Sequence, residues 1–214
     1  MKHLVFWFDP ISPFAYLAFE RLPQVLEGLS VEVSYRPLLF AGLLKHWGQK
    51  GPAEIEPKRA WTFRHVHWLA QHHGIELQTP THHPFNPLAL LRLMLACTPA
   101  GGTPSRHVCE SVLRHVWRGG LDATDPARVA ALTTLLAPTR APDSDGVKHE
   151  LREATEVALA RGVFGVPSIE VDGRMFWGVD SLDMLSAHLR GDPWFASGVW
   201  EDAGAALPGL HRPV

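Results

Sequence analysis

Strand-like patterns lie only near the two ends of this 214-residue chain, and this placement limits the folds that it can adopt. Residues 3–8 form a near-continuous apolar run, as expected of a strand buried on both faces. Residues 31–36 alternate and predict a second strand, closed by Pro37. A helical pattern over residues 12–28 separates the two, and Pro23 inside it is expected to kink or split the helix. The order is β-α-β, with the crossover length of a parallel pair.

The C-terminal part of the chain predicts a hairpin followed by a helix. Residues 168–171 and 174–177 have the composition of strands, and the Asp-Gly pair at 172–173 between them favours a tight turn. A last helix is expected over residues 181–189. Residues 191–214 contain both Pro and Gly and stay unassigned.

The long middle part, residues 41–161, has helical periodicity and almost no strand signal. A polar residue followed by proline favours a helix start, because the polar side chain can cap the helix and proline suits its first turn. Helices are expected over residues 57–73 and 146–161, and over stretches that open at Asn86, Thr103 and Asp125.

Several large or reactive side chains of the middle part are expected to serve packing. Trp61, Trp68 and Trp117 are predicted to pack the inserted helices rather than to stack on a cofactor. Cys97 and Cys109 fall in helical patterns and are predicted to be buried core residues. Two cysteines are too few for a disulfide scaffold, and their spacing is not that of metal ligands.

These patterns predict an α/β protein whose single sheet is assembled from both ends of the chain. The order βαβ, helices, ββα is that of a thioredoxin-like fold whose two halves are separated by a large inserted all-helical domain. The expected domains are a discontinuous thioredoxin-like domain over residues 1–40 and 162–214, and a helical insertion over residues 41–161.

Composition excludes several classes of protein. The hydrophobic fraction of 46% argues against a disordered chain. The net charge of −2, with no basic run, argues against a nucleic-acid partner. The 13 histidines show no metal-ligand pattern, so no metal is expected. The first apolar stretch is too short for a signal peptide, and a run that could span a membrane is absent, so a cytoplasmic protein without a membrane partner is expected.

Ser12 stands where the first strand gives way to the first helix. A thioredoxin-type unit carries its C-x-x-C motif at this place, but residues 12–15 read Ser-Pro-Phe-Ala and have no thiol. The hydroxyl and the free N–H groups of the helix start could stabilise the thiolate of an external ligand, since helix N-termini lower thiol pKa values. The alternative is that Ser12 serves only as the N-cap.

Two further segments also have both a structural and a ligand-binding interpretation. Pro167 precedes a strand, at a position that resembles the cis-proline of thioredoxin-like folds, so it is expected to be cis and close to Ser12. The alternative is an ordinary trans proline at a strand start. Asp180 either caps the last helix or binds the ammonium group of a ligand while neighbouring N–H groups take a carboxylate.

Residues 8–18, 164–168 and 176–180 together resemble the 2-hydroxychromene-2-carboxylate isomerase family. This family belongs with the kappa-class glutathione transferases among DsbA-like thioredoxin-fold proteins. The resemblance implies that glutathione is the cofactor and that Ser12 is the catalytic residue, which contacts and activates its sulfur. It also implies glutathione contacts from the cis-proline loop and the hairpin end, namely Val166, Pro167, Gly178, Val179, Asp180 and Ser181.

The same resemblance implies a substrate site in the insertion. Gln49 occupies the place where the family often supplies an Asn near the thiol, and its amide offers the same donor and acceptor groups. Lys58 and Asn86 are candidates for the carboxylate and oxygens of the substrate, with capping at Pro87 as the alternative role of Asn86. The chain departs from the family at Ala15 and Ser181, where relatives often carry Ser and Arg.

The predicted activity is a glutathione-dependent isomerisation of an aromatic or unsaturated carboxylate, by reversible addition of the thiolate, as in aromatic catabolism. The expected partner is a small-molecule substrate, and a homodimer is left open. The alternatives are a kappa-type glutathione transferase or peroxidase, and a non-catalytic DsbA-like binding protein.

Overall fold

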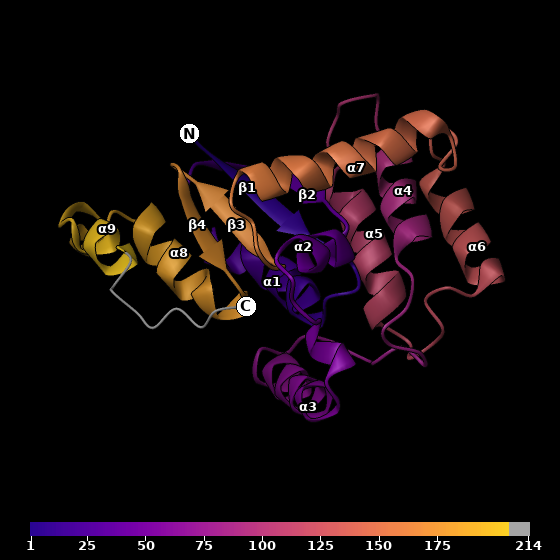
Figure 1. Ribbon diagram of the computed structural model, residues 1–214, viewed down its shortest axis with the longest axis horizontal. Helices are drawn as coiled ribbons and strands as arrows, with labels where there is room; N and C mark the ends of the chain where they lie inside the picture. Colours follow the sequence, from indigo (N-terminus) through magenta and orange to yellow (C-terminus); the bar gives the residue numbers. More distant parts are fainter. Residues whose placement is uncertain (206–214) are drawn as a thin grey trace.

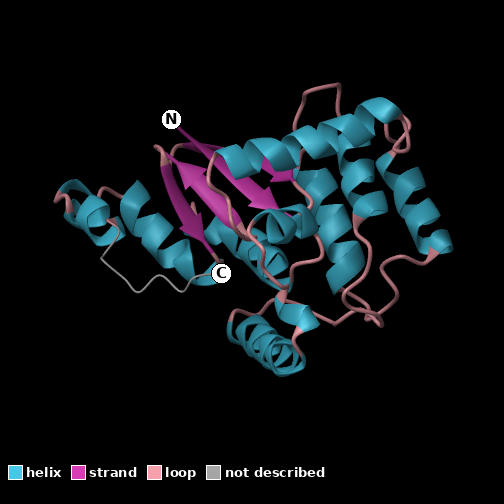
Figure 2. Ribbon diagram, viewed as in Figure 1, coloured by secondary structure: helices cyan, strands magenta, loops and turns pink. Residues whose placement is uncertain are grey.

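The computed structural model describes residues 1–205, and its centre is a four-stranded mixed sheet in the order β2-β1-β3-β4 (Figure 2). β1 (Lys2–Phe8) pairs in parallel with β2 (Val31–Pro37) and antiparallel with β3 (Ser168–Val171). β3 continues into β4 (Arg174–Trp177) as an antiparallel hairpin. The two ends of the chain therefore share one sheet, and the predicted thioredoxin-like fold is confirmed (Figure 1).

The apolar run of β1 is buried on both faces of the sheet. Phe6 and Phe8 enter the main cluster of buried apolar side chains, whereas Trp7 enters a second cluster on the opposite face. Phe6 lies between Tyr35 of β2 and Ile169 of β3 in the register of the sheet. This explains why β1 reads as a continuous apolar run rather than an alternating one.

α1 (Pro13–Val25) runs through Pro23 as one helix, so the expected split is wrong. Proline lacks the N–H that would bond the carbonyl four residues earlier, here that of Phe19. Arg106 supplies the missing donor instead, because its Nη2 lies 3.3 Å from the Phe19 carbonyl oxygen. Pro23 also lies in the last turn of α1, where few helical bonds remain to be broken.

The insertion is helical, as predicted. It consists of α2 (Phe40–His46), the short 3₁₀ helix η1 (Pro52–Glu54), α3 (Glu56–His72), α4 (Leu88–Ala96), α5 (Arg106–Trp117), α6 (Pro126–Leu136) and α7 (Asp145–Ala160). Figure 1 shows α7 lying along the sheet and α3 set apart at the lower side of the molecule.

Two expected helix starts are displaced and one is confirmed. Asp125 caps α6 as predicted, with its side chain accepting from the N–H of Arg128. α5 begins after Ser105 rather than at Thr103, because the Ser105 hydroxyl accepts from the N–H of Val108 and takes the capping role. α4 begins two residues after Asn86, whose Oδ1 accepts from the first N–H of the helix at 3.1 Å.

The C-terminal region adds four short elements after the hairpin. These are η2 (Val179–Ser181), α8 (Leu182–Leu189), η3 (Pro193–Ala196) and α9 (Val199–Gly204). The stretch left unassigned from the sequence is therefore partly helical, and residues 206–214 of it lie outside the described residues. Within residues 1–205, the helices are too short or too polar to cross a membrane.

The predicted packing roles hold for some residues and fail for others. Trp117 and Cys109 are fully buried, and Cys97 is half-buried. Trp61 and Trp68 were expected to pack the inserted helices but are 65% and 58% exposed, because the opposite face of α3, with Val66 and Ala70, is the buried one. One cluster of buried apolar residues joins the sheet to α1, α4 and α5, so the division at residues 40 and 162 stays a prediction.

Candidate active site at the start of the first helix

Ser12 caps α1, and its hydroxyl is held from two sides. Its Oγ accepts from the N–H of Ala15 at 3.2 Å and lies 3.4 Å from the carbonyl oxygen of Val166, to which it can donate. The second contact is long for an O–H donor, so the hydroxyl can turn toward a ligand at little cost. The N–H of Phe14, in the first turn, has no acceptor among the described residues. The helix start therefore offers two donors to an anion.

The loop that faces Ser12 contains the predicted cis-proline. The peptide bond between Val166 and Pro167 is cis, and the contact from Ser12 joins residues 154 positions apart. The predicted cis bond and the predicted proximity of the two loops are both confirmed. A second cis bond, which the sequence did not suggest, joins His83 to Pro84.

The end of the hairpin is attached to the same loop. The N–H of Gly178 donates to the carbonyl oxygen of Pro167 at 2.9 Å, and the Ser181 hydroxyl donates to the carbonyl oxygen of Gly178 at 2.9 Å. Val179 is buried, whereas Asp180 is exposed. The three sequence segments that carry the resemblance thus lie at one end of the molecule.

Asp180 does not cap the last helix, so that alternative is wrong. Gly178 has a φ of 90°, a conformation that glycine favours, and the chain then makes one 3₁₀ turn before α8. This turn leaves Ser181 at the N-cap position, without a side-chain cap bond. The Asp180 carboxylate makes no hydrogen bond or ion pair with another described residue and is free to meet a ligand.

A cavity of about 850 Å³ opens beside Ser12. It brings together five of the predicted site residues, namely Ser12, Gln49, Lys58, Asn86 and Val166. Pro167 and residues 178–181 are not among its walls, although the neighbouring Trp177 is. The predicted substrate residues therefore share one cavity, and the predicted γ-glutamyl residues lie outside it, past Trp177.

The walls of this cavity are apolar, with a positive charge at one side. Its aromatic side chains are Phe14, Phe40, Phe63, Phe85, Phe164 and Trp177. Lys50, Lys58 and Arg59 line it and make no ion pair with another described residue. Glu54 opposes them only in part, because its Oε1 accepts from the N–H of Gly51 at 2.6 Å. The arrangement suits a flat apolar ligand that carries an anionic group.

Asp9 is a buried carboxyl group at the base of the cavity, and sequence reasoning missed it. Its Oδ1 accepts from the N–H of Ile11 at 3.0 Å and its Oδ2 accepts from the N–H of Phe40 at 2.9 Å. Burial raises the pKa of Asp9 to about 7, against the lowering effect of the two backbone bonds. The sequence signal was an acidic residue directly after an apolar strand.

His83 is a second wall residue that the sequence did not assign. Its Nε2 lies 2.9 Å from the carbonyl oxygen of Ile11, the residue before Ser12. A carbonyl oxygen only accepts, so Nε2 carries the proton and Nδ1 of the neutral ring is an acceptor. Burial lowers the pKa of His83, and Arg59 adds to this. Nδ1 is buried without a partner among the described residues.

Trp177 and Gly165 form a close contact at the mouth of the cavity. The indole Nε1 of Trp177 lies over Gly165, where a Cβ would overlap the ring. The ring of Phe164 meets the indole edge-to-face, with centroids 5.0 Å apart. Gly165 therefore allows an exposed aromatic pair to stand beside the cis-proline loop.

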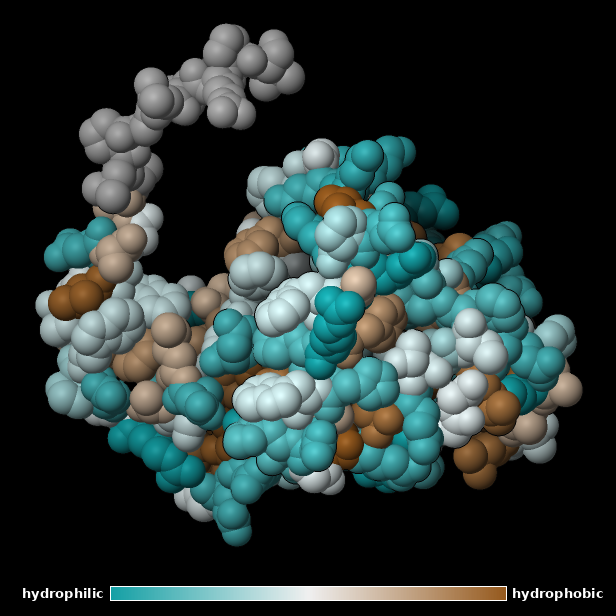
Figure 3. Space-filling view, turned by 90° about the horizontal axis from the view of Figure 1, so that it is seen from below, coloured by the Kyte–Doolittle hydropathy of each residue, from teal (hydrophilic) through white to brown (hydrophobic). Residues whose placement is uncertain are grey.

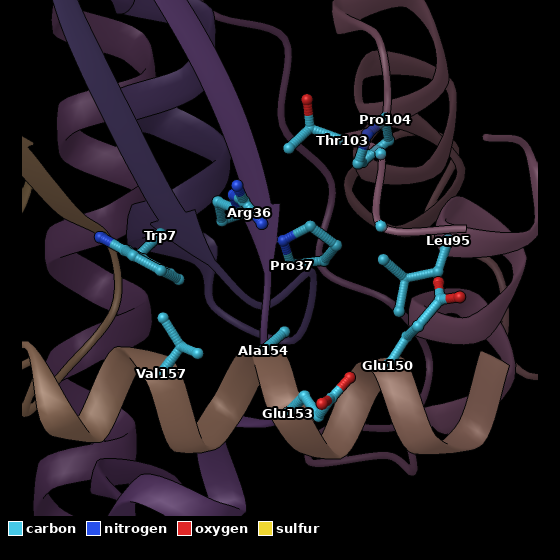
Figure 4. Close-up of a pocket in the computed structure, with 12 residues that line it drawn as sticks. Trp7, Arg36, Pro37, Leu95, Thr103, Pro104, Glu150, Glu153, Ala154 and Val157 are labelled. Atoms are coloured by element: carbon cyan, nitrogen blue, oxygen red, sulfur yellow. The ribbon is translucent and has the colours of Figure 1, made fainter. Parts of the chain in front are cut away.

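A second cavity, of about 220 Å³, lies between β2 and α7 (Figure 4). Arg36 of β2 and Glu153 of α7 line it, and Glu150 beside them is paired with Arg140 at 2.8 Å. Within the described part of the chain, its walls contain none of the predicted site residues. The larger cavity is therefore the candidate active site.

Known proteins resemble this chain along most of its length. The sequence model of the DSBA-like thioredoxin domain matches residues 3–190. The chain belongs to this family. Human glutathione S-transferase kappa 1 is 28% identical to it over 210 residues, which cover 88% of this chain and 90% of the human protein. The 2-hydroxychromene-2-carboxylate isomerase of Sphingobium xenophagum is 29% identical over 199 residues, 88% of this chain and 98% of that protein.

Solved structures of this DsbA-like family agree in fold. A 2-hydroxychromene-2-carboxylate isomerase superposes with a TM-score of 0.77 at 23% identity, covering 95% of this chain and all of the other. The cytosolic disulfide reductase DsbM from Pseudomonas aeruginosa, solved with GSH, superposes with a TM-score of 0.55 at 15% identity, covering 88% and 99% of the two chains. At these identities the likeness concerns the fold alone.

Proposed function

We propose that this DsbA-like protein is a glutathione-dependent isomerase that acts on an unsaturated or aromatic carboxylate. The observation that carries the proposal is the position of Ser12. Its hydroxyl caps α1, faces the cis-proline loop and lies in a large apolar cavity with unpaired cations on one side. The names of two relatives, glutathione S-transferase kappa and 2-hydroxychromene-2-carboxylate isomerase, support a glutathione-dependent isomerase.

The residues around Ser12 fit an external thiol. No cysteine occurs within residues 12–15, so the chain itself supplies no thiol at the helix start. The cavity volume, about 850 Å³, falls in the range of roughly 300–1,000 Å³ that small-molecule sites occupy. The unpaired carboxylate of Asp180 provides a partner for an ammonium group at the far end of a peptide-like ligand.

When bound, glutathione would supply a thiolate that adds reversibly to a conjugated carbon and leaves after the carbon–carbon bond has rotated, so that it is not consumed. Ser12 would turn its hydroxyl from Val166 to the sulfur, and the N–H of Phe14 would add a second donor. Hydrogen bonds to the charged form favour that form, so both groups would favour the thiolate form of the sulfur.

The cis-proline loop and the hairpin end would hold the rest of the cofactor. Val166 would pair its backbone with the cysteinyl residue beside Pro167, and Asp180 would bind the γ-glutamyl ammonium. Gly178, Val179 and Ser181 would offer backbone groups to the neighbouring carboxylate. The bond between Gly178 and Pro167 supports this arrangement, because it fixes the distance between the two contact regions.

The insertion would hold the substrate. Lys58 and the neighbouring Arg59 would bind its carboxylate, and Gln49 and Asn86 would bind other oxygens as charge moves onto them during addition. The aromatic walls would bind the flat carbon skeleton and exclude water from the addition. Phe40 and Phe63 belong to these walls.

Two measurements test this function. Calorimetry with reduced glutathione is expected to show binding to the wild type, and ring-opening isomerisation of a hydroxychromene carboxylate is expected to require catalytic glutathione. Conjugation of an electrophilic arene, or reduction of a peroxide, without isomerisation would identify a kappa-type transferase or peroxidase, the second candidate that the human relative supports. Absence of glutathione binding would leave a non-catalytic DsbA-like binding protein.

A further inference from the structure

The turn between β1 and α1, residues 9–12, carries Ser12, and each of its four carbonyl oxygens accepts a hydrogen bond. Two of the donors are nearby backbone groups. The N–H of Ser12 donates to the carbonyl oxygen of Asp9 at 3.0 Å, and the N–H of Tyr16 donates to that of Ser12 at 3.2 Å. The other two donors are side chains of the insertion, which lie 72 and 107 positions away along the chain.

His83, in the connection between α3 and α4, is one of these two donors. Its Nε2 lies 2.9 Å from the carbonyl oxygen of Ile11, which belongs to the peptide group that leads into Ser12. The N–H of the same peptide group donates to the carbonyl oxygen of Asp9. The peptide group is therefore held at its oxygen and at its hydrogen. Because a peptide group is planar, this sets the position of the next Cα, from which the Ser12 side chain starts.

Trp117 is the second donor, and it also packs against His83. The indole Nε1 of Trp117 lies 2.8 Å from the carbonyl oxygen of Pro10, and its ring centroid lies 5.7 Å from that of His83. Phe63 and Phe85 meet the ring of His83 edge-to-face, with centroids 5.1 and 6.1 Å apart. These contacts restrict the orientation of the imidazole, so its N–H stays directed at the turn.

α3 contributes Phe63 to this group from its inner face. α3 lies at the lower side of the molecule in Figure 1, and Figure 3, which views that side from below, shows a mainly hydrophilic surface with scattered hydrophobic patches. Val66 and Ala70, one and two turns after Phe63, are buried. The apolar face of α3 is therefore turned toward the core and toward His83.

A direct catalytic role is the competing interpretation of His83, because its side chain lines the large cavity. The other ring nitrogen, Nδ1, is buried and has no partner among the described residues. A buried atom does not reach a substrate or a thiol in the cavity. Moving the ring hydrogen to Nδ1 would bury an unpaired donor and set two acceptors against each other at Ile11. The geometry therefore favours a role through Ile11.

We propose that His83 is a positioning residue of the candidate active site, which holds the carbonyl group of Ile11 so that the Ser12 hydroxyl stays directed at the sulfur of a bound thiol. This inference rests on the proposed glutathione-dependent function, because the thiol is that of glutathione. In this role His83 touches neither glutathione nor substrate. The insertion then takes part in thiol activation as well as in substrate binding.

Two substitutions separate the hydrogen bond of His83 from the packing of its ring. His83→Phe keeps an aromatic ring and removes the donor. His83→Gln keeps a donor, because the amide nitrogen of Gln stands about as far from the backbone as Nε2 does. The matched control is His115→Phe. The Nε2 of His115 lies 3.0 Å from the carbonyl oxygen of Ala123, and neither residue lines the large cavity within the described part of the chain.

Nuclear magnetic resonance of the ligand-free protein tests whether His83 holds the turn. The wild type is expected to carry the ring proton of His83 on Nε2. His83→Phe is expected to speed the hydrogen exchange of the Ser12 N–H by about tenfold, because local opening governs exchange. His83→Gln is expected to restore the wild-type rate, and His115→Phe to leave it unchanged. Equal rates in all four proteins would overturn the proposal, whether or not the protein binds glutathione.

Thiol titration and turnover test the consequence for the site. In His83→Phe, the thiolate absorbance of bound glutathione is expected to titrate at higher pH than in the wild type. Turnover number is expected to fall roughly tenfold, while the Michaelis constant of the organic substrate stays near its wild-type value. His83→Gln is expected to recover both properties. A His83→Phe variant that behaves like His115→Phe in both would refute the positioning role.

A double-mutant cycle tests whether His83 acts through Ser12. In a Ser12→Ala background, His83→Phe is expected to change neither the thiol titration nor the turnover further, because the hydroxyl that it positions is already gone. Additive losses would show that His83 acts on the thiol by another route, and would also refute the proposal. A wild type that binds no glutathione would contradict the proposed function, and hydrogen exchange at Ser12 would still decide whether His83 holds the turn.

Discussion

The starts of α1 and α5 are built in the same way, yet they differ in what lies opposite them. Ser12 and Ser105 both accept a hydrogen bond from the N–H three residues later, at 3.2 and 3.3 Å. The Ser12 hydroxyl also contacts Val166 and lines the large cavity, whereas the Ser105 hydroxyl makes only its cap bond among the described residues. The comparison shows that a serine cap becomes a candidate site through the loop that faces it, and not through the cap itself.

Charge separates the two helix starts further. The start of α1 rests on Asp9, a carboxyl group fully enclosed between the N–H groups of Ile11 and Phe40. The start of α1 also faces the large cavity, whose walls contain the unpaired cations Lys50, Lys58 and Arg59. Neither helix has an acidic residue in its first turn, so the difference comes from Asp9 and from the cavity.

The largest effect is expected from Asp9→Asn, measured as the pH dependence of the free energy of unfolding. The pKa of Asp9 is about 7 in the folded protein and near 3.8 in an unfolded chain, so the folded state binds more protons between these values. Asp9 therefore stabilises the fold fully below about pH 4, and this contribution is lost as pH rises through 7. This difference in the pKa of Asp9 corresponds to a change of about 4 kcal/mol in the free energy of unfolding.

Urea unfolding at pH 4 to 8 measures this difference, and subtraction of the Asp9→Asn curve cancels the titration of every other group. The amide can accept only one of the two backbone N–H bonds, so the variant is expected to be less stable throughout. What distinguishes the variant is that its free energy of unfolding lacks the pH dependence that Asp9 contributes. Parallel curves for the wild type and the variant would show that Asp9 does not titrate in this range.

The second effect is on the thiol of bound glutathione. Ser12→Ala removes a donor to the sulfur, so thiolate absorbance is expected to titrate at higher pH than in the wild type. Turnover is expected to fall by roughly 100-fold, the lower bound for loss of one donor to a reacting anion. Ser105→Ala loses an equivalent cap and is expected to match the wild type in both measurements. Equal behaviour of the two variants would reduce Ser12 to a structural cap.

The third effect concerns Asp180, whose carboxylate makes no contact with another described residue. Asp180→Asn is expected to weaken glutathione binding about tenfold, the loss expected for one charge-assisted hydrogen bond at an exposed site. Calorimetry measures it, and Asp183→Asn serves as the control because Asp183 lies one turn further along, on α8, paired with Arg21 at 3.4 Å. An unchanged dissociation constant for Asp180→Asn would remove this residue from the proposed ammonium site.

The features that the sequence predicted depend on local patterns. The buried run of β1 and the Asp-Gly turn at 172–173 each specify their structure through a few adjacent residues. The cis bond at Pro167 was expected instead from the likeness of its position to thioredoxin-like folds. The order of these elements then brought Ser12 and Pro167 to the same end of the sheet. The order of the elements was enough to predict this arrangement, because a right-handed crossover leaves few ways to place two parallel strands and their helix.

The features that the sequence missed depend on distant parts of the chain. Asp9 is enclosed only because the start of α2 reaches it from 31 residues away. The exposure of Trp61 and Trp68 also escaped prediction, since periodicity shows which residues share a helix face but not whether another element covers it. The displaced start of α5 reflects two capping residues, Thr103 and Ser105, that compete within one turn.

The smallest effect separates stability from function at the same two helix starts. Ser12→Ala and Ser105→Ala each remove one cap bond, and each is expected to lower the free energy of unfolding by about 1 kcal/mol. Urea titration in the absence of ligand measures both. If both variants lose the same free energy of unfolding but only Ser12→Ala loses turnover, the functional role of Ser12 comes from the facing loop at Val166. A much larger loss for Ser12→Ala would mean that the contact with Val166 holds the two halves of the sheet together, and that any loss of turnover reflects a disturbed fold.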